Sequence, residues 1–363
     1  MKNRSDPFFR YDAADLHRLA AALLENAGLA ADRAAVVAET LLEADLLGVS
    51  THGLVRLPGN LDWLERGETR RDGDPIIVSD HGSCVVWDAD FLPGPWVVRQ
   101  GLDIILGRAT KEGTATLVIR RAQHIACLAA YLRRATDAGK ILLMLVSTPG
   151  ERLVVPFGGL DPAFSTNPIA AGLPTSGDPI LIDFSTSMTS YGAVRRARAE
   201  GRRLDSPALQ RSDGTPTDDP RVIDADPGVT LLPMGGAEQG YKGFALGLLA
   251  EVLTSALGGY GGIQVGADGE ANAVFMQAID PASFGGSDAY RREADRIAAL
   301  CRSSRPRPGE PPVRLPGDRA CTLRREQLEQ GVELRPDVVA QLKERARRAG
   351  LIFPLPLQGE RAG

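Results

Sequence analysis

The chain of 363 residues is 43% hydrophobic and 24% charged, which is typical of a soluble globular protein, and at about 150 residues per domain its length predicts two or three lobes. Its formal net charge of −4 gives no indication of a nucleic-acid partner. Its four cysteines form no Cys-x-x-Cys pair, and it has no run of about 18 apolar residues. We therefore expect no structural metal, no membrane span and a reduced, cytoplasmic setting.

The first seventy residues have the pattern of helices. Asp12 is a good N-cap residue, and apolar residues recur at helical spacing from there until Gly28 stops the helix. A second helix is predicted over 32–47 and is ended by Gly48. A third, short helix is predicted over 57–64.

Strands and helices alternate after residue 75, which predicts an α/β protein. The predicted strands are 75–78, 83–87, 114–119, 141–147, 180–183 and 273–279. The predicted helices are 95–109, 125–138, 188–200, 241–257, 288–301 and a final helix within 326–350. Residues 201–232 are rich in Asp, Pro, Gly and Thr and are predicted to form a long surface connection, and 303–316 a proline-rich linker.

The junction after the second helix carries the most suggestive side chains. His52 precedes a glycine, and Arg56 follows four positions later. Histidine transfers protons near neutral pH, and a guanidinium group binds a carboxylate through two parallel hydrogen bonds. Residue type alone leaves structural alternatives open, namely a capping or core histidine and a surface arginine. No Gly-x-Gly-x-x-Gly follows an early strand, so the ordinary Rossmann phosphate loop is missing.

Several short motifs in a fixed order resemble those of one family. They are Thr51-His52-Gly53 with Arg56, Pro156-Phe157-Gly158-Gly159, Ser165-Thr166-Asn167-Pro168, Asp183-Phe184-Ser185-Thr186-Ser187, Gly235-Gly236 and Lys242-Gly243. Together they resemble the malate/L-lactate dehydrogenase family of the non-Rossmann type, which includes ureidoglycolate and sulfolactate dehydrogenases and piperideine-2-carboxylate reductases. The resemblance runs from about residue 12 to residue 351 and covers nearly the whole chain.

The resemblance implies a fold, a cofactor and an activity. The fold is α/β, a mixed sheet with flanking helices of the L-sulfolactate dehydrogenase type. It implies a helical N-terminal segment (1–75) that contributes substrate and proton-transfer residues, a nucleotide-binding α/β region (76–300), and a C-terminal linker and helix (301–363) that pack back on the first segment. It also implies a homodimer that uses NADH or NADPH to interconvert a small 2-oxo and 2-hydroxy acid, or to reduce a cyclic imino acid.

The resemblance also assigns roles to particular residues. His52 is the expected proton donor, and Asp183 is expected to orient that imidazole or to stabilise its charge. Thr51, Arg56 and His124 are expected to contact the substrate, with Arg56 binding its carboxylate and His124 lying near the nicotinamide as well. For Asp183, the alternative of a carboxylate that caps a turn after its strand stays open.

The cofactor is expected to lie against small residues and backbone amides. Phe157, Gly158 and Gly159 would let the dinucleotide approach the backbone, and Thr166 and Asn167 offer hydrogen bonds. Ser185, Thr186 and Ser187 precede a predicted helix, where free N–H groups favour phosphate. Lys242 is expected to pair with a phosphate or to face the substrate, or else is a solvated lysine at a helix start.

The chain departs from the family pattern around the expected pocket. His124-Ile125-Ala126 replaces His-Phe-Gly, and Gly192-Ala193 replaces Gly-Lys, which removes a positive charge. Two hypotheses follow. The first is a working reductase with altered cofactor preference or an unusual substrate, which the retained His52, Arg56 and Asp183 favour. The second is a non-redox relative, a lyase, isomerase or binding protein, with a rebuilt pocket.

Overall fold

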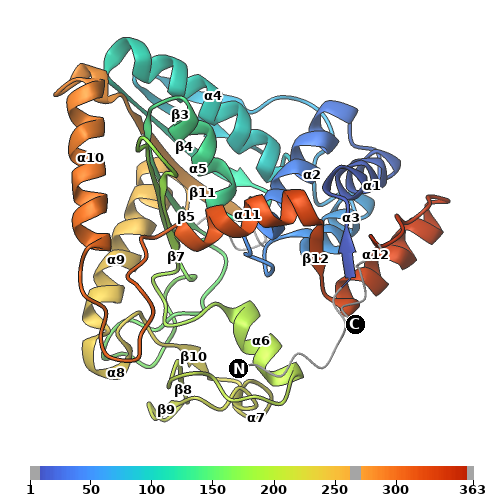
Figure 1. Ribbon diagram of the computed structural model, residues 1–363. Coiled ribbons are helices and arrows are strands. Elements are labelled where there is room, and N and C mark those ends of the chain that lie inside the picture. The colour runs from blue at the N-terminus through green and yellow to red at the C-terminus, as the bar shows by residue number, and fades with distance from the viewer. Residues whose placement is uncertain (1–8, 262–270, 358–363) are drawn as a thin grey trace.

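A seven-stranded mixed sheet forms the centre of the computed structural model, which describes residues 9–261 and 271–357 (Figure 1). The strand order is β2-β3-β4-β11-β5-β6-β7, and only the β3–β4 pair within it is parallel. The strands are β2 (Ile76–Asp80), β3 (Cys84–Asp88), β4 (Thr114–Ala122), β5 (Ile141–Ser147), β6 (Ile169–Leu173), β7 (Ile180–Phe184) and β11 (Asn272–Ile279). The predicted mixed α/β architecture is therefore confirmed.

Helices cover both faces of this sheet, because its central strands are apolar on both sides. In β4, Leu117 and Ile119 pack into a cluster with α4 (Gly94–Glu112) and α5 (Ala129–Asp137). Val118 between them packs instead against Ala250 of α9 (Tyr241–Glu251), on the opposite face. This alternation follows from the two-residue repeat of a strand. The sequences of these strands are therefore continuous apolar runs and do not alternate between apolar and polar residues.

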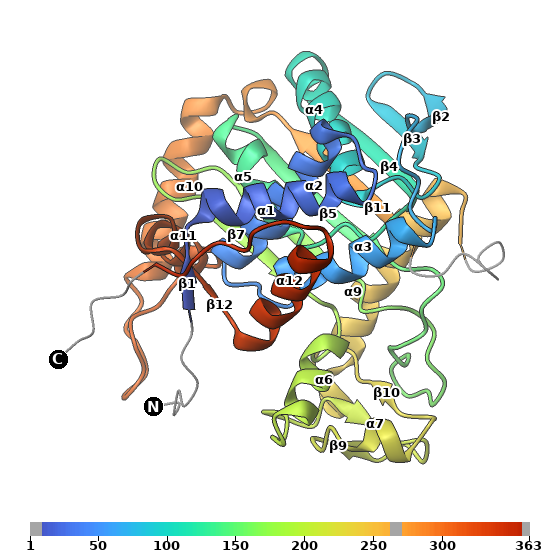
Figure 2. The same cartoon turned by 90° about the vertical axis from the view of Figure 1, so that its right-hand side faces the viewer.

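The N-terminal helices form a second apolar cluster beside the sheet. They are α1 (Ala13–Asn26), α2 (Ala31–Leu46) and α3 (Leu57–Glu65), and the side chain of Asp12 caps α1 as predicted by accepting the Asp15 N–H at 3.0 Å. The C-terminal helix α12 (Pro336–Arg348) packs against α1 and α3, and β12 (Val332–Leu334) pairs with β1 (Phe9–Tyr11), so the two ends of the described chain lie side by side (Figure 2). Residues 1–8 and 358–363 of the predicted terminal segments lie outside the described residues.

A small lobe stands where a long surface connection was predicted. The stretch 201–232 contains three two-residue strands and a short helix, β8 (Leu209–Gln210), β9 (Pro216–Thr217), α7 (Val222–Ala225) and β10 (Thr230–Leu231). They pack with α6 (Tyr191–Ala199) around Val194, Leu209 and Leu231 (Figure 2). Strands of two residues are too short to show a period, so the sequence pattern missed them.

The remaining helix predictions agree with the structure in part. The final helix predicted within 326–350 is α12. The preceding helix α11 (Asp318–Gln330) was not predicted and ends before Gly331, which has a φ of 93° and precedes β12. The helix predicted over 241–257 is confirmed, since α9 continues into one turn of π-helix, Val252–Ala256, and the helical conformation ends at residue 258. The helix predicted to begin at residue 125 begins at Ala129. The remaining helices are α8 (Gly236–Gln239) and α10 (Ser287–Arg302), with short 3₁₀ turns at Leu54–Arg56 and Pro281–Ser283.

None of the helices within residues 9–261 and 271–357 is both long enough and apolar enough to cross a bilayer.

Candidate active site

A buried carboxylate fixes the turn that carries His52. Asp45 lies one residue before the end of α2 and is only 7% exposed, and it accepts the Leu54 N–H at 2.7 Å. A Cβ atom on Gly53 would lie 2.3 Å from the Asp45 carboxyl, so only glycine fits between them. Burial raises the pKa of Asp45 from 3.8 to about 7, because the charged form is poorly solvated there.

The sequence prediction missed Asp45, although a signal for it was present. Ala38, Leu41, Leu42 and Asp45 follow one another at helical spacing on the buried face of α2. An acidic residue on a buried helix face requires a partner, and here the partner is a backbone N–H at the start of the next helical segment.

His124 reaches the site from the opposite side, at the end of β4. Its ring stacks on that of His52, with 5.8 Å between the ring centroids and 16° between the planes. This approach depends on Gly94 at the start of α4, since a Cβ there would lie 1.9 Å from the carbonyl oxygen of Gln123. The structure therefore brings together two histidines that are 72 residues apart in the sequence.

Trp63 completes this cluster and was not predicted. Its ring lies 6.4 Å from that of His124, and the guanidinium carbon of Arg56 lies 5.8 Å from the centre of the Trp63 ring. Arg56 and Trp63 are seven residues apart, which is two turns of helix and places them on one side of the 3₁₀ turn and α3. That spacing was the available signal for Trp63.

The electrostatics of the cluster favour neutral imidazoles. Burial and then the positive charge of Arg56 lower the pKa of His52 from 6.5 to about 4. Burial, Arg56 and His52 lower the pKa of His124 well below its usual value. Thr51 supports His52 through a hydrogen bond between its Oγ1 and the ring Nδ1, at 2.9 Å. An anion bound near Arg56 would offset the charge that disfavours protonation of both rings.

Asp183 makes contacts other than the one predicted for it. Its Oδ2 accepts the Ala129 N–H at 2.9 Å and lies 3.6 Å from the thiol of Cys127. The residue as a whole is exposed, but burial of its carboxyl group raises the pKa of Asp183. The hydrogen bonds from Ala129 and Cys127 oppose this rise. Asp183 thus ties the segment after His124 to the end of β7, and a role toward His52 stays a prediction.

The predicted cofactor residues fall into two groups. In the first, the exposed rings of Phe157 and Tyr241, 41% and 50% exposed, meet edge to face at 6.0 Å, and Lys242 Nζ lies 5.6 Å from the Tyr241 ring. Gly158 beside them has a φ of 82° and open space where a Cβ would stand. The fold therefore places Lys242 next to the 156–159 turn, from which it is more than eighty residues away in sequence.

The second group is buried or half-buried and is hydrogen-bonded within the protein. The Thr186 N–H and hydroxyl both bond the Thr166 carbonyl oxygen, at 3.0 and 3.1 Å. Ser187 Oγ donates to the Thr189 carbonyl at 2.7 Å and lies 3.1 Å from Ser185 Oγ. The helix expected to start at residue 188 starts at Tyr191, with Ser190 as its N-cap. These residues therefore do not lie in the first turn of a helix, and phosphate binding by them stays a prediction.

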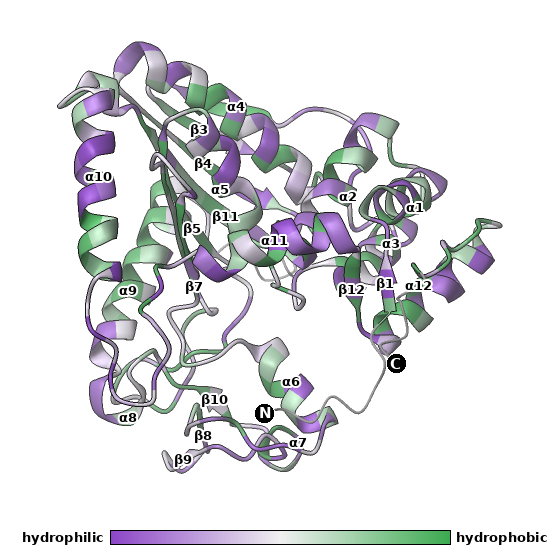
Figure 3. Ribbon diagram, viewed as in Figure 1, coloured by the Kyte–Doolittle hydropathy of each residue, from purple (hydrophilic) through white to green (hydrophobic). Residues whose placement is uncertain are grey.

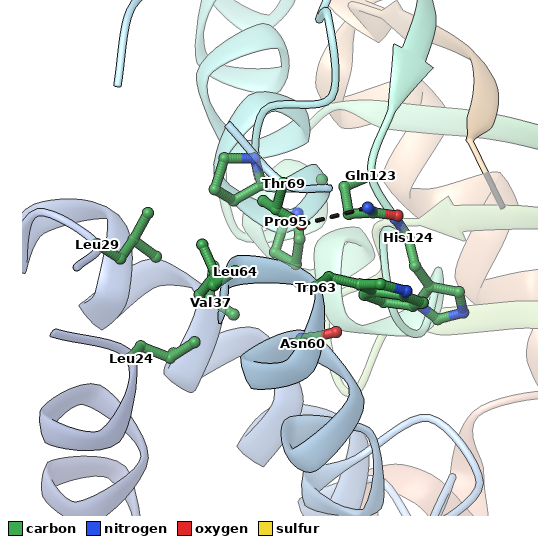
Figure 4. Close-up of a pocket in the computed structure, with 12 residues that line it drawn as sticks. Leu24, Leu29, Val37, Asn60, Trp63, Leu64, Thr69, Pro95, Gln123 and His124 are labelled. Atoms are coloured by element: carbon green, nitrogen blue, oxygen red, sulfur yellow. Dashed lines mark hydrogen bonds between the residues drawn. The ribbon is translucent and has the colours of Figure 1, made fainter. Parts of the chain in front are cut away.

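A small cavity lies behind Trp63 and His124, between the N-terminal helices and the start of α4 (Figure 4). Its volume is about 20 Å³, and Asn60 is one of the residues that line it. The buried Oδ1 of Asn60 has no hydrogen-bond partner among the residues that the structure describes. A cavity of this volume holds one water molecule and is too small for an organic acid.

Comparison with known proteins gives the relatives of this chain. A family model described as malate/L-lactate dehydrogenase matches residues 11–343. Hydroxycarboxylate dehydrogenase B of Escherichia coli O157:H7 is 29% identical over 348 residues, 94% of this chain and 95% of that protein. Delta(1)-pyrroline-2-carboxylate reductase of Ancylobacter novellus is 30% identical over 350 residues, 92% of this chain and 96% of that protein.

A solved structure confirms the predicted fold. Sulfolactate dehydrogenase from Methanocaldococcus jannaschii matches with a TM-score of 0.84 and 25% identity over 96% of this chain and 98% of that one.

Asp45→Asn tests the buried carboxyl, because it keeps an acceptor for the Leu54 N–H and removes the titration. With a folded pKa of about 7 against 3.8 unfolded, the folded state binds the proton more tightly. The contribution of Asp45 to the free energy of unfolding therefore falls as pH rises from about 4 to 7, by up to about 4 kcal/mol at 1.36 kcal/mol per pKa unit.

Urea unfolding between pH 4.5 and 7.5 measures this effect. Asp45→Asn should gain stability relative to the parent as pH rises, whereas Asp32→Asn, at an exposed position in the first turn of the same helix, should not. Parallel pH curves for the parent and Asp45→Asn would contradict the assignment.

Proposed function

Since the chain belongs to the malate/L-lactate dehydrogenase family, and is thereby a nicotinamide-dependent dehydrogenase or reductase, we propose that it interconverts a small 2-oxo and 2-hydroxy acid, or reduces a cyclic imino acid. The observation that supports this most directly is the stacked pair of His52 and His124 beside the guanidinium group of Arg56. A proton-transfer group and a carboxylate-binding group thus lie together at one site, as such a reaction requires.

The residues around the 156–159 turn fit a nicotinamide dinucleotide. Two exposed aromatic rings, Phe157 and Tyr241, offer faces for a base, and Lys242 beside them offers a positive charge for a phosphate. Gly158 leaves the backbone uncovered, which permits a close approach. We propose that these residues, with Gly159, Thr166, Asn167 and the 185–187 segment, hold NADH or NADPH, which supplies or takes up the hydride when bound.

The protein side of the reaction follows from the charges of the site. Arg56 binds the substrate carboxylate, which places the adjacent carbon near the two imidazoles. In the oxidative direction neutral His52 accepts the hydroxyl proton, and in the reductive direction protonated His52 returns it to the developing oxyanion or amine. The bound carboxylate partly cancels the charge of Arg56, so substrate binding itself makes protonated His52 less unfavourable.

Nucleotide binding tests the proposal against the non-redox alternative. A ligand that binds only the folded state raises the melting temperature by mass action. We expect NADH or NADPH to raise it, and Lys242→Ala to weaken that effect. A panel of 2-oxo acids and cyclic imino acids, followed by nicotinamide absorbance, then identifies the substrate class. No shift with either nucleotide at millimolar concentration would favour a lyase, an isomerase or a binding protein.

The pH dependence of kcat/KM tests the role of His52, since this ratio reports the free enzyme. With a His52 pKa of about 4, oxidation should be independent of pH between 5 and 8, and reduction should fall about tenfold per pH unit over the same range. His52→Ala should lower kcat by about 10²- to 10⁴-fold in both directions.

Arg56→Gln provides the second arm of this experiment. Loss of the neighbouring positive charge should raise the pKa of His52, so the pH profiles of both directions should move to higher pH. KM for the acid should rise as well. Arg66→Gln, at the C-terminal end of the same helix and paired with Glu68, is the control and should change neither. An unchanged pH profile in Arg56→Gln would contradict the placement of Arg56 in the site.

We also propose that the enzyme is a homodimer that buries one face of α9. Between Lys242 and Glu251 this helix carries only apolar residues and glycine, and much of its ribbon is green in Figure 3. A helix that is apolar all round is normally buried. Ala250 and Gly247 on one side pack inside the protein, whereas three neighbouring side chains on the helix and its π-turn are about half exposed, namely Leu248, Leu249 and Val252. Contiguous apolar surface of this kind marks an interface.

Light scattering after gel filtration tests the homodimer. The parent should have twice the chain mass of 38.7 kDa, and Leu249→Glu should lower the mass toward that of a monomer. Leu300→Glu, at a 62% exposed leucine on α10, should leave the mass unchanged. A monomeric parent, or equal masses for both variants, would contradict an interface at α9.

A further inference from the structure

The loop that carries His124 is specified by side chains rather than by backbone pairing. Three successive N–H groups donate to side-chain atoms: His124 N–H to Gln123 Oε1 at 3.0 Å, Ile125 N–H to Asn272 Oδ1 at 3.0 Å, and Ala126 N–H to His124 Nδ1 at 3.1 Å. Ala126 has a φ of 65°, a left-handed conformation that residues with a Cβ seldom adopt. Such a conformation persists only where the surroundings impose it.

The bond from Ala126 determines which nitrogen of His124 carries the proton. A backbone N–H can only donate, so Nδ1 must present its lone pair. A neutral imidazole with an acceptor at Nδ1 carries its hydrogen on Nε2. Burial and the nearby charge of Arg56 keep the ring neutral, which is consistent with this arrangement. No residue within the described ranges bonds Nε2, so the Nε2–H remains available to a ligand.

Asn272 holds this loop from the first residue of β11. Its side chain is only 5% exposed, and its two ends are both engaged: Oδ1 accepts the Ile125 N–H, and Nδ2 donates to Thr148 Oγ1 at 3.0 Å. The pairing of β11 with β4 shifts register between Asn272 and Val274, which is where the side chain turns toward the loop. The amide therefore has one orientation, and it bridges the His124 loop to the end of β5.

The same hydrogen-bond network continues to the predicted cofactor residues. The Thr148 N–H donates to Ser165 Oγ at 2.9 Å, and Ser165 Oγ donates to Asn167 Oδ1 at 2.7 Å. Asn167 is fully buried, and its Nδ2 donates to Glu251 Oε2 at 2.9 Å. Asn272 is thus the link between His124 and a chain of buried polar groups that reaches α9.

We propose that Asn272 is a positioning residue that holds His124 as a neutral Nε2–H donor for the carbonyl oxygen, or the imine nitrogen, of the substrate. This rests on the proposed function. It separates the tasks of the two imidazoles: His52 transfers the proton, and His124 donates a hydrogen bond that strengthens as negative charge develops on the substrate. A donor fixed in place before the reaction needs no reorientation during it.

Nitrogen-15 NMR of the imidazoles tests the assignment in the full-length protein without nucleotide or substrate. The chain has four histidines, so a His124→Gln variant identifies the His124 signals by their loss. We expect a bare, acceptor-type Nδ1 and a protonated Nε2 at His124. Asn272→Leu should mix or reverse these signatures and lower kcat/KM about 10- to 100-fold, less than direct loss of an oxyanion donor costs.

Two further variants separate positioning from general damage to the fold. Asn272→Asp keeps an acceptor for the Ile125 N–H, and the Thr148 hydroxyl can rotate to donate to it, so this variant should restore the parental signature and most of the activity. Gln277→Leu removes a comparable bond from the same strand, 3.1 Å to Thr116 Oγ1, and should change neither readout. Asn272→Ser repeats the test if Asn272→Leu does not fold.

The outcomes distinguish this proposal from the proposed function. A proton on Nδ1 of His124 in the parent, or an unchanged His124 signature in both Asn272→Leu and Asn272→Ser, would overturn the positioning role. The expected signatures in a protein that binds no nucleotide would support the fixed tautomer and refute the dehydrogenase function instead.

Discussion

The hydrogen bond between the Asp45 carboxyl and the Leu54 N–H is the contact on which the site depends. It closes the turn between α2 and α3 tightly enough that only glycine fits at position 53. His52 and Arg56 lie on either side of that turn, so their relative placement follows from it. The N-terminal helices then pack beside the sheet, and this docking presents the turn to the end of β4, where His124 lies.

Two neutral imidazoles beside the guanidinium group of Arg56 suit a reaction on an acid. The free site holds its positive charge on Arg56 rather than on the rings, because burial and the charge of Arg56 both disfavour imidazolium. A substrate carboxylate bound to Arg56 would offset the effect of that charge on the protonation of the two rings. Under the proposed function, the substrate would thereby help to set the protonation state that its own reduction requires, and an uncharged ligand at the same position would not.

Some errors of the sequence-based predictions lie at the candidate site. The pattern from residue 125 predicted helix, but Ile125 and Ala126 form a loop whose N–H groups bond Asn272 and His124. A partner 147 residues away leaves no periodic signal near the loop. Asp45 and Trp63 were likewise missed, although their helical spacing indicated where each would lie. Local propensity is overridden at positions where the site requires a special conformation.

The sequence by itself determined the family, the α/β class and most of the helices and strands, and it predicted His52, Arg56 and His124 as members of one site. These follow from apolar periodicity, capping residues and ordered motifs, which are properties of neighbouring residues. Only the tertiary structure decided that Lys242 lies by the 156–159 turn, that Asp183 bonds Ala129 rather than a histidine ring, and that Asn272 holds the His124 loop. Each depends on contacts between distant segments, and those contacts form only when the apolar faces of the sheet and helices are buried together.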